Sequence, residues 1–405
     1  GWLMSGLKGS GRRLCSNSVF PDMHRLIRLI LVTAPALLLA APAPPARPAA
    51  AAADLDSLAS PLLFQGDAMK TFYVSPAGND ANPGSRDKPF RSIERARDAV
   101  RQVNRNMTGD IVVVLGGGTY RIAAPIVFDH RDSATGGWAV VYRSADGEPA
   151  VISGGRAITG WLPDTDGRWK ATTDLGNFRQ LYVDGKRAVR ARGGALPGAE
   201  LHGKDGYTTT AVAMADWRNQ GDIEFCYHVV WCHTRCKVRD IKREGDRAIV
   251  TMLQPHFTHA REKEGVQVQL PSHVENALEL LDEPGEWVLN TLERRLYLWP
   301  RGERPEEIEA PQLTELIRVE GEVDYDGPRD TPVRGLTFRG LGFARADRWP
   351  WEKERIGWTL QHDWEMFDRP TAMVRLRGAE RIAFEQCRWF DSGGAGIRLD
   401  LHAQS

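Results

Sequence analysis

The most constraining feature of this 405-residue chain is a pattern of short apolar strands that repeats towards its C-terminus. Residues 317–321 (IRVEG) lead to 336–343 (LTFRGLGF), and residues 374–378 (VRLRG) lead to 382–389 (IAFEQCRW). Apolar positions match in order: Leu336 with Ile382, Phe338 with Phe384, and Leu341 with Cys387. Such a repeat is typical of stacked coils, and another coil is expected to begin at residue 397.

An earlier part of the chain carries the same kind of pattern. Ile111–Leu115 is a continuous apolar run closed by three glycines, which indicates a strand buried on both faces. Strand-like segments follow at 120–122, 126–128, 139–142 and 150–152, with no room for helices between them. Parallel strands joined by tight turns, without crossover helices, predict a solenoid.

A short strand and a helix precede the first coil. Residues 71–75 alternate as a strand, and Ser92 is a plausible N-cap for a helix whose apolar positions are Ile93, Ala96, Val100 and Val103. A helix with so narrow an apolar stripe must lie over something else, and we expect it to cap the open end of the first coil.

The region 160–311 has a different sequence pattern, without the repeat of short parallel strands. It reads as antiparallel hairpins: 181–183 with a turn at Asp184-Gly185, 238–252 folded at 244–246, and 287–289 with 296–299. We therefore predict an inserted β-barrel or sandwich domain.

The first 53 residues are typical of processing rather than of a fold. A basic start at 23–28, an apolar core at 29–41 and small residues at 41–43 or 51–53 indicate a secretory signal peptide after upstream residues. The apolar run is shorter than the roughly 20 residues a spanning helix needs. We expect export to the periplasm or the medium, with no membrane span after cleavage.

Composition excludes one class of partner. The formal net charge is zero and the pI is near 7.3, which gives no electrostatic footprint for nucleic acid.

The cysteines are concentrated in CYHVVWCHTRC, 226–236, with His228 and His233 between them. The spacing matches no standard zinc motif. If 226–232 is one strand, its even positions share a face, and the cysteines are best explained as small packing residues. We predict no metal, while a disulfide after export stays open.

Several ordered motifs resemble one known group. These are FYVSPAGNDANPGSRDKPFRSIERARDAV (72–100), LGGGTY (115–120), AVISGGRAITGW (150–161), ENALELLDEPGEWVLN (275–290) and LYLWP (296–300). In this order they resemble the N-terminal half of bacterial right-handed parallel β-helix proteins, the group that includes glycoside hydrolase family 141. The resemblance covers about residues 71–405 and implies that the opening strand and helix close the N-terminal end of the β-helix.

The resulting fold expectation is all-β: a pectate-lyase-like, right-handed parallel β-helix with an N-terminal helical cap and an inserted antiparallel β domain. We divide the chain into upstream residues and signal peptide (1–53), a linker (54–70), cap and first coils (71–159), the inserted domain (160–311) and further coils (312–405). Because a coil begins just before residue 405, we expect a truncated protein that is inactive on its own.

One group of candidate site residues comes from the last coils. Arg398, Asp400 and His402 alternate with apolar residues, and Arg375 and Arg377 project from the matching strand. A column of such side chains suits binding of a sugar chain. The alternative is a solvated surface on which these charged side chains pair with one another. We name Asp400 and His402 as catalytic candidates, and Arg375, Arg377 and Arg398 as substrate-binding candidates.

The other group lies in a long loop between Leu336 and Ile382. Long loops on rigid scaffolds often bind ligands. Its catalytic candidates are His362, Asp363 and Glu365, and its sugar-stacking candidates are Trp349, Trp351 and Trp364. The resemblance implies that the principal catalytic carboxylates lie beyond residue 405.

The leading functional hypothesis is a secreted glycoside hydrolase that acts on a polysaccharide and is a monomer without a cofactor. One alternative is a non-catalytic polysaccharide-binding or surface protein. Another is a polysaccharide lyase, which would require Ca²⁺ held by carboxylates and a basic residue to take the proton.

Overall fold

We describe the protein from a computed structural model. The structure describes residues 68–229, 232–262, 267–302, 305–325, 329–348 and 372–404. The chain divides into two units, Gly1–Leu58 and Ala59–Ser405, and every described residue belongs to the second. Within these residues the protein is mostly β, with two α-helices, α1 (Ile93–Val100) and α2 (His256–Glu262). None of the helices among them is both long enough and apolar enough to span a membrane.

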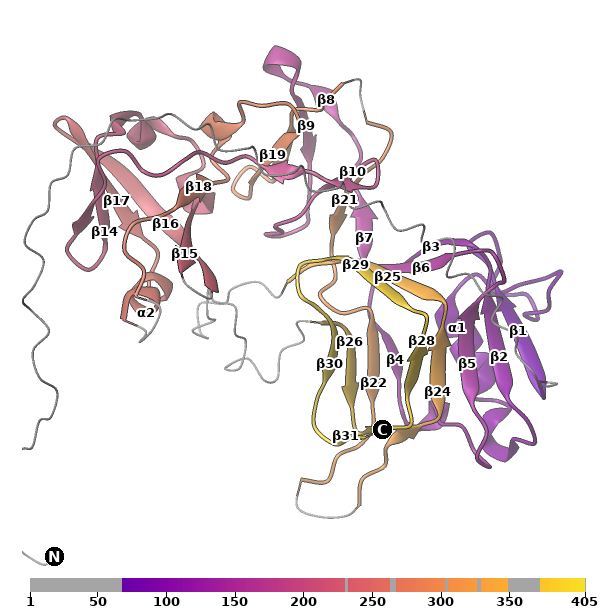
Figure 1. Ribbon diagram of the computed structural model, residues 1–405. Helices are drawn as coiled ribbons and strands as arrows, with labels where there is room; N and C mark the ends of the chain where they lie inside the picture. The colour runs from indigo at the N-terminus through magenta and orange to yellow at the C-terminus, as the bar shows by residue number, and fades with distance from the viewer. Residues whose placement is uncertain are drawn as a thin grey trace, which may run out of the picture. The chain divides into compact units, whose positions relative to one another are not determined.

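Among the described residues, four sheets consist entirely of parallel strands, three of four or five strands and one smaller (Figure 1). The first has the order β1 (Lys70–Val74), β2 (Ile111–Leu115), β5 (Val140–Ser144), β24 (Leu336–Arg339) and β28 (Ala383–Glu385). The second has the order β4 (Ile126–Phe128), β22 (Ile317–Glu320), β26 (Ala372–Arg377) and β30 (Ala395–Leu399). The third has the order β3 (Gly118–Arg121), β6 (Ala150–Ser153), β25 (Leu341–Ala346) and β29 (Arg388–Ser392). A small parallel sheet joins β23 (Val333–Arg334), β27 (Ala379–Glu380) and β31 (Ala403–Gln404).

The register of these sheets confirms the sequence repeat. Phe338 pairs with Phe384 in the first sheet, and Arg375 pairs with Arg398 in the second. In the third sheet Gly342 pairs with Arg388. The residues directly before them, Leu341 and Cys387, are therefore in the register that the sequence predicted. Segments that match in the sequence are therefore neighbours in space, each strand lying beside its equivalent.

Stacked aromatic rings run along the buried side of the parallel sheets. Tyr142 and Phe338 stack with ring centroids 5.7 Å apart, and Phe338 and Phe384 stack at 5.1 Å with an interplanar angle of 13°. A second column pairs Phe343 with Trp389 at 5.5 Å. Each such pair adds about 0.5–1.5 kcal/mol beyond its buried area, so the rings help to fix the register.

Strand β2 is buried on both faces, as its continuous apolar sequence predicts. Ile111, Val113 and Leu115 belong to the large core between the parallel sheets. Val112 and Val114 pack in a separate cluster with Val141. A strand covered on both sides has no place for a polar side chain, which explains its composition.

Helix α1 begins where the sequence predicted, because the Ser92 hydroxyl oxygen accepts a hydrogen bond from the backbone N–H of Arg95. Its buried residues are Ile93, Ala96, Ala99 and Val100, and they join the core that also contains Phe72 and Val74 of the edge strand β1. The helix ends at Val100, and a 3₁₀ turn at Asn104–Asn106 follows, so Val103 lies beyond it.

Three further sheets occupy the region that follows β6. One has the order β11 (Lys186–Arg187), β10 (Tyr182–Val183), β21 (Ile308–Pro311) and β7 (Gly155–Ala157). Another has the order β12 (Val189–Arg190), β19 (Glu286–Asn290), β20 (Arg295–Leu298), β9 (Trp169–Thr172) and β8 (Leu162–Pro163). The last has the order β13 (Glu200–His202), β14 (Gly206–Thr209), β17 (Arg247–Met252), β16 (Cys232–Glu244), β15 (Glu224–Val229) and β18 (His273–Glu275). The remaining 3₁₀ helices are η3 (His130–Asp132), η4 (Thr165–Gly167), η5 (Val212–Asp216), η6 (Gln220–Asp222) and η7 (Leu278–Leu280).

All three predicted hairpins form in this region: β10 with β11, β16 with β17, and β19 with β20. Two features were not foreseen. Strands β12 and β19 pair in parallel, because the chain returns to β12 only after forming the six-stranded sheet. Helix α2 is also new; it is short, and its buried residues are His256, Phe257 and Ala260. The boundaries 160 and 311 of an inserted domain stay a prediction.

Candidate functional site

Three arginines line up across the second parallel sheet. Arg318 of β22 pairs with Arg375 of β26, which in turn pairs with Arg398 of β30. Arg318 donates to the buried carboxylate of Glu315 over 2.6 Å, and burial raises the pKa of Glu315 above its ordinary value. We use the name arginine column for Glu315, Arg318, Arg375, Arg398 and Asp400.

Asp400 is the anion that balances the middle of the arginine column. Both Nε and Nη2 of Arg375 donate to its Oδ2, over 3.1 and 2.9 Å. Burial alone would raise the pKa of Asp400, but the Leu401 N–H and Arg375 outweigh it and lower that pKa below its ordinary value. A carboxylate held ionised in this way suits binding or charge balance better than proton donation.

Two predicted site residues point to other partners. His402 contacts Asp330 through Nδ1 and has a left-handed backbone conformation, with φ at 54°, so the predicted alternation ends with β30 at Leu399. Arg377 donates to the hydroxyl of Tyr325. The structure thus brings Arg375, Arg398 and Asp400 together and leaves His402 and Arg377 with partners of their own.

The second predicted group belongs to a part of the chain that the structure does not describe. Its members are Trp349, Trp351, His362, Asp363, Trp364 and Glu365. All of them lie in 349–371, outside the described residues.

A cluster that the sequence did not reveal lies just before this loop. Arg345 of β25 forms ion pairs with Asp391 of β29 and with Glu309 of β21, the latter at 3.3 Å, and its guanidinium lies 4.0 Å from the ring centroid of Tyr182. Tyr182 donates its hydroxyl hydrogen to the backbone oxygen of Asp391. Arg187 donates to Tyr182 and to the carbonyl of Ser392. We call Tyr182, Arg187, Glu309, Arg345 and Asp391 the Arg345 cluster.

The backbone explains how this cluster arises. Arg345 and Asp391 both have positive φ, 59° and 55°, a conformation uncommon outside glycine. Asp391 precedes two glycines at 393 and 394 and its φ fits a turn, yet its side chain meets Arg345 of the neighbouring strand. Each strand therefore bends at the same level, which turns opposite charges towards each other.

A pocket adjoins the Arg345 cluster through Arg187. Its volume is about 640 Å³, and its lining includes Lys186, Arg187, Leu298, Pro300 and Arg301. Cations beside apolar rings and chains suit a ligand that offers both hydroxyl or anionic groups and apolar faces.

Asp347 is a buried carboxyl group near these residues, and its charge also acts on Tyr182. It directly follows β25, is 8% exposed, and accepts a hydrogen bond from the backbone N–H of Arg348 over 2.7 Å. Burial raises the pKa of Asp347 to about 6, although Arg348 N–H and the charge of Arg179 oppose the rise. A carboxyl group that is half protonated near pH 6 can act as a general acid. The only sequence signal for it was its place before the long loop.

A second surface, on the six-stranded sheet, gathers polar and ionisable groups on one face. Cys226 pairs with His273 and with Arg235, and His228 pairs with His233. The other face is apolar and contributes to a core with Phe225, Tyr227, Cys236, Val238 and Val274. Strands β15 and β16 form a hairpin in which Val229 pairs with Cys232, so Cys226 and Cys232 do not share the single strand assumed from the sequence.

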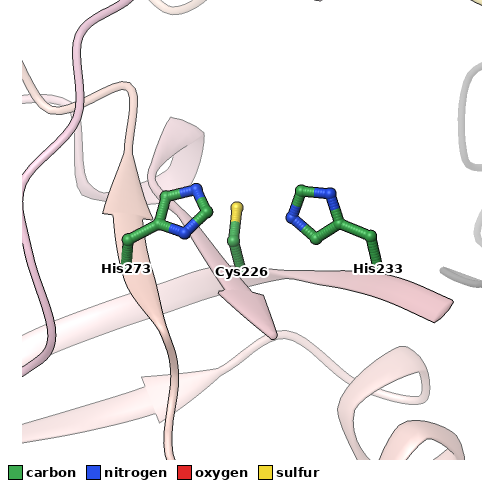
Figure 2. Close-up of side chains that lie close together, drawn as sticks. All are labelled: Cys226, His233 and His273. Atoms are coloured by element: carbon green, nitrogen blue, oxygen red, sulfur yellow. The ribbon is translucent and has the colours of Figure 1, made fainter. Parts of the chain in front are cut away.

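The cysteines of this hairpin have different surroundings. Cys236 packs in the apolar core, as expected for a small packing residue. Cys226 is fully buried on the polar face, where its sulfur lies between the rings of His233 and His273 (Figure 2). The ligand atoms of these three residues all lie within 4.8 Å of one another. Cys226, Cys236 and Cys387 are free thiols.

Charged residues surround the cysteine and the histidines. Arg179 forms ion pairs with Glu224 and, over 2.8 Å, with Glu275, and Arg190 pairs with Glu224 over 3.2 Å. Arg179 also links this face to Asp347, whose pKa it helps to hold down.

Comparisons of the sequence and the fold with known proteins show which proteins this chain resembles. Residues 165–301 match the model of the GH141 insertion domain. A solved structure titled "Glycoside hydrolase" is 26% identical, with a TM-score of 0.67; the match covers 81% of this chain and 63% of that one. The uncharacterized protein YwoF of Bacillus subtilis (strain 168) is 33% identical over 82 residues, which are 20% of this chain and 15% of YwoF. The chain thus spans less than two thirds of these relatives. It resembles the group that includes glycoside hydrolase family 141.

Proposed function

We propose that this chain belongs to a secreted glycoside hydrolase that cleaves a polysaccharide. The likeness to a solved glycoside hydrolase carries the proposal, because it covers 81% of the chain, more than the parallel sheets or the region 160–311 alone. The match of 165–301 to the GH141 insertion domain supports it independently.

The proposed scaffold is a right-handed parallel β-helix with α1 as its cap and an inserted domain at 160–311. Three parallel sheets whose successive strands come from successive segments of the chain support this architecture. The signal peptide within 1–53, the export and the monomeric state belong to the same proposal, as does the absence of a nucleic-acid partner.

Hydrolysis of a glycosidic bond generally needs two carboxyl groups, one that donates a proton to the leaving oxygen and one that stays charged. Asp347 is proposed as the donor, since burial raises its pKa to about 6. Asp391 is proposed as the charged partner, because its contact with Arg345 favours a carboxylate. Asp391 lies on β29, and Asp347 directly follows the neighbouring strand β25, whose last residue, Ala346, pairs with Ser392.

In this proposal the proton of Asp347 passes to the glycosidic oxygen as the bond to the anomeric carbon breaks. Asp391 either attacks that carbon or removes a proton from the water that attacks it. Tyr182 and Arg345 hold Asp391 in place through the contacts of the Arg345 cluster. Asp400, His402, His362, Asp363 and Glu365 remain further catalytic candidates.

The arginine column is proposed as a binding surface for the same sugar chain. Arg375 and Arg398 lie on adjacent strands, so they present donors at the spacing of neighbouring strands, about 4.8 Å. Guanidinium groups recognise hydroxyl and carboxylate oxygens of sugars through paired hydrogen bonds. Arg377 and the tryptophans at 349, 351 and 364 complete the proposed set.

The test is to incubate the whole protein with a panel of purified plant and algal polysaccharides. New reducing ends, formed without ultraviolet-absorbing unsaturated products, are the expected result. Binding without any reducing ends would identify a non-catalytic polysaccharide-binding protein. Unsaturated products that depend on Ca²⁺ would identify a lyase.

A further inference from the structure

We propose that Cys226, His233 and His273 form a binding site for a thiophilic transition-metal ion of the Zn²⁺ class. The three residues come from three adjacent strands, β15, β16 and β18. Their ligand atoms all lie within 4.8 Å of one another. His273 comes from a strand 47 residues along from Cys226, which is why sequence spacing alone gave no zinc motif.

Chemistry selects the kind of ion. One thiolate and two imidazoles are ligands that Zn²⁺ and similar ions prefer, whereas Ca²⁺ and Mg²⁺ require oxygen ligands. Around a tetrahedral Zn²⁺ with ordinary bond lengths, ligand atoms are about 3.3–3.6 Å apart. The distances between the ligand atoms of the three residues therefore need to shorten by about 1 Å, which rotation of the side chains allows.

His273 is already oriented for coordination. Its Nε2 lies 3.1 Å from Oε1 of Glu275. A proton on Nε2 donated to Glu275 leaves Nδ1 with a free lone pair for the ion. A carboxylate behind a metal-bound histidine is the usual second partner in such sites and raises the basicity of the ring.

His233 supplies the other imidazole. Its Nε2 is buried and has no hydrogen-bond partner among the described residues, a costly state for a polar atom unless a ligand fills it. Figure 2 shows the sulfur of Cys226 between the two rings. The Nδ1 of His233 lies 3.1 Å from Nη2 of Arg235, a contact that has to open when Nε2 binds an ion, because Nδ1 then carries the proton.

His228 lies beside the two histidine ligands. The ring of His228 is exposed, and its centroid lies 4.5 Å from that of His233 and 5.4 Å from that of His273. Three protein ligands with one open position are typical of metal sites that bind water or a further ligand.

Arg235 and Glu275 provide a pair of variants with opposite expected signs. Glu275→Gln removes the carboxylate behind His273 and should weaken metal binding by about 10–100-fold. Arg235→Gln removes a positive charge and offers an amide oxygen that accepts the Nδ1 proton of His233, so it should tighten binding. A purely structural role of these residues would not produce opposite effects on affinity.

The experiment titrates the whole protein, reduced and free of chelator, with Zn²⁺ by calorimetry and with Co²⁺ by absorbance. The expected result is one ion per chain and a thiolate-to-cobalt charge-transfer band. Cys226→Ala should remove the band, and His273→Ala should weaken binding even if the first variant folds poorly. Cys236→Ala, on the apolar face of the same sheet, and Cys387→Ala should retain it. No binding by the wild type, or an unchanged band in Cys226→Ala, would overturn the proposal.

Discussion

Arg345 and Asp391 are 46 residues apart in the chain, yet they form an ion pair between neighbouring parallel strands. Phe338 and Phe384 have the same separation, and so do Arg339 and Glu385. In the second sheet Val374 pairs with Ile397, only 23 residues further on. The longer separation exceeds the shorter one by 23 residues, yet the strands on either side of the undescribed segment keep their register.

The aromatic column should dominate the stability of the parallel sheets. Phe338 is buried and stacks on Tyr142 and on Phe384, so Phe338→Ala removes a filled volume as well as two ring contacts. We expect a loss of about 3–5 kcal/mol in the free energy of unfolding. Urea denaturation checks this, with the more exposed Phe390→Ala as a control expected to cost far less. Equal losses in both variants would mean that the column has no special role.

Asp347 should make stability fall as pH rises. Its pKa is raised to about 6 in the folded protein, against about 3.9 in the unfolded chain. Between about pH 4 and pH 6 the folded state holds a proton that the unfolded state has lost, so the free energy of unfolding decreases with pH. This group contributes a decrease on the order of 2–3 kcal/mol.

Asp347→Asn should flatten that decrease, because an amide accepts the Arg348 N–H without titrating. Thermal melting between pH 4 and pH 8 measures the effect. The exposed Asp246→Asn is the matched control and should keep the wild-type profile. An unchanged profile in Asp347→Asn would show that this carboxyl group titrates normally.

Structural and binding roles should separate between Asp400, in the arginine column, and Arg377, on the same strand as Arg375. Asp400→Asn leaves the buried Arg375 without its anion and should lower the free energy of unfolding by about 1–3 kcal/mol. Arg377→Gln affects a half-buried residue and should change stability by no more than about 0.5 kcal/mol.

The same variants test sugar binding by affinity electrophoresis in gels that contain the polysaccharide. Arg377→Gln should weaken the affinity about tenfold, since a charge-assisted hydrogen bond is lost from a protein that is otherwise intact. Unaltered affinity in this stable variant would remove Arg377 from the binding surface.

The sequence predicted the parts of the fold that depend on periodicity. Equivalent apolar positions such as Phe338 and Phe384 could be matched because like residues stack, and the Ser92 cap is a local signal. Pairings between segments that are distant in the chain have no periodic or local signal in the sequence. The approach of His273 to Cys226 and the parallel pair of β12 with β19 depend on how whole sheets assemble.

The candidate site was predicted only in part for the same reason. Arg375, Arg398 and Asp400 share a face by strand alternation, so the sequence could group them. The Arg345 cluster depends on positive φ angles at Arg345 and Asp391. An arginine or an aspartate in a sequence does not by itself predict such an angle. The environment of Asp347 depends on Arg179, which lies far away in the chain.

Hydrolysis of a polysaccharide is the central claim, and the origin of the new oxygen tests it most directly. The whole protein is incubated with a substrate from the panel in water enriched in oxygen-18, and the products are weighed by mass spectrometry. The account predicts one oxygen-18 atom at each new reducing end, beyond the exchange seen when finished product is incubated alone. Chain cleavage with an unsaturated sugar and no incorporated oxygen-18 would contradict it.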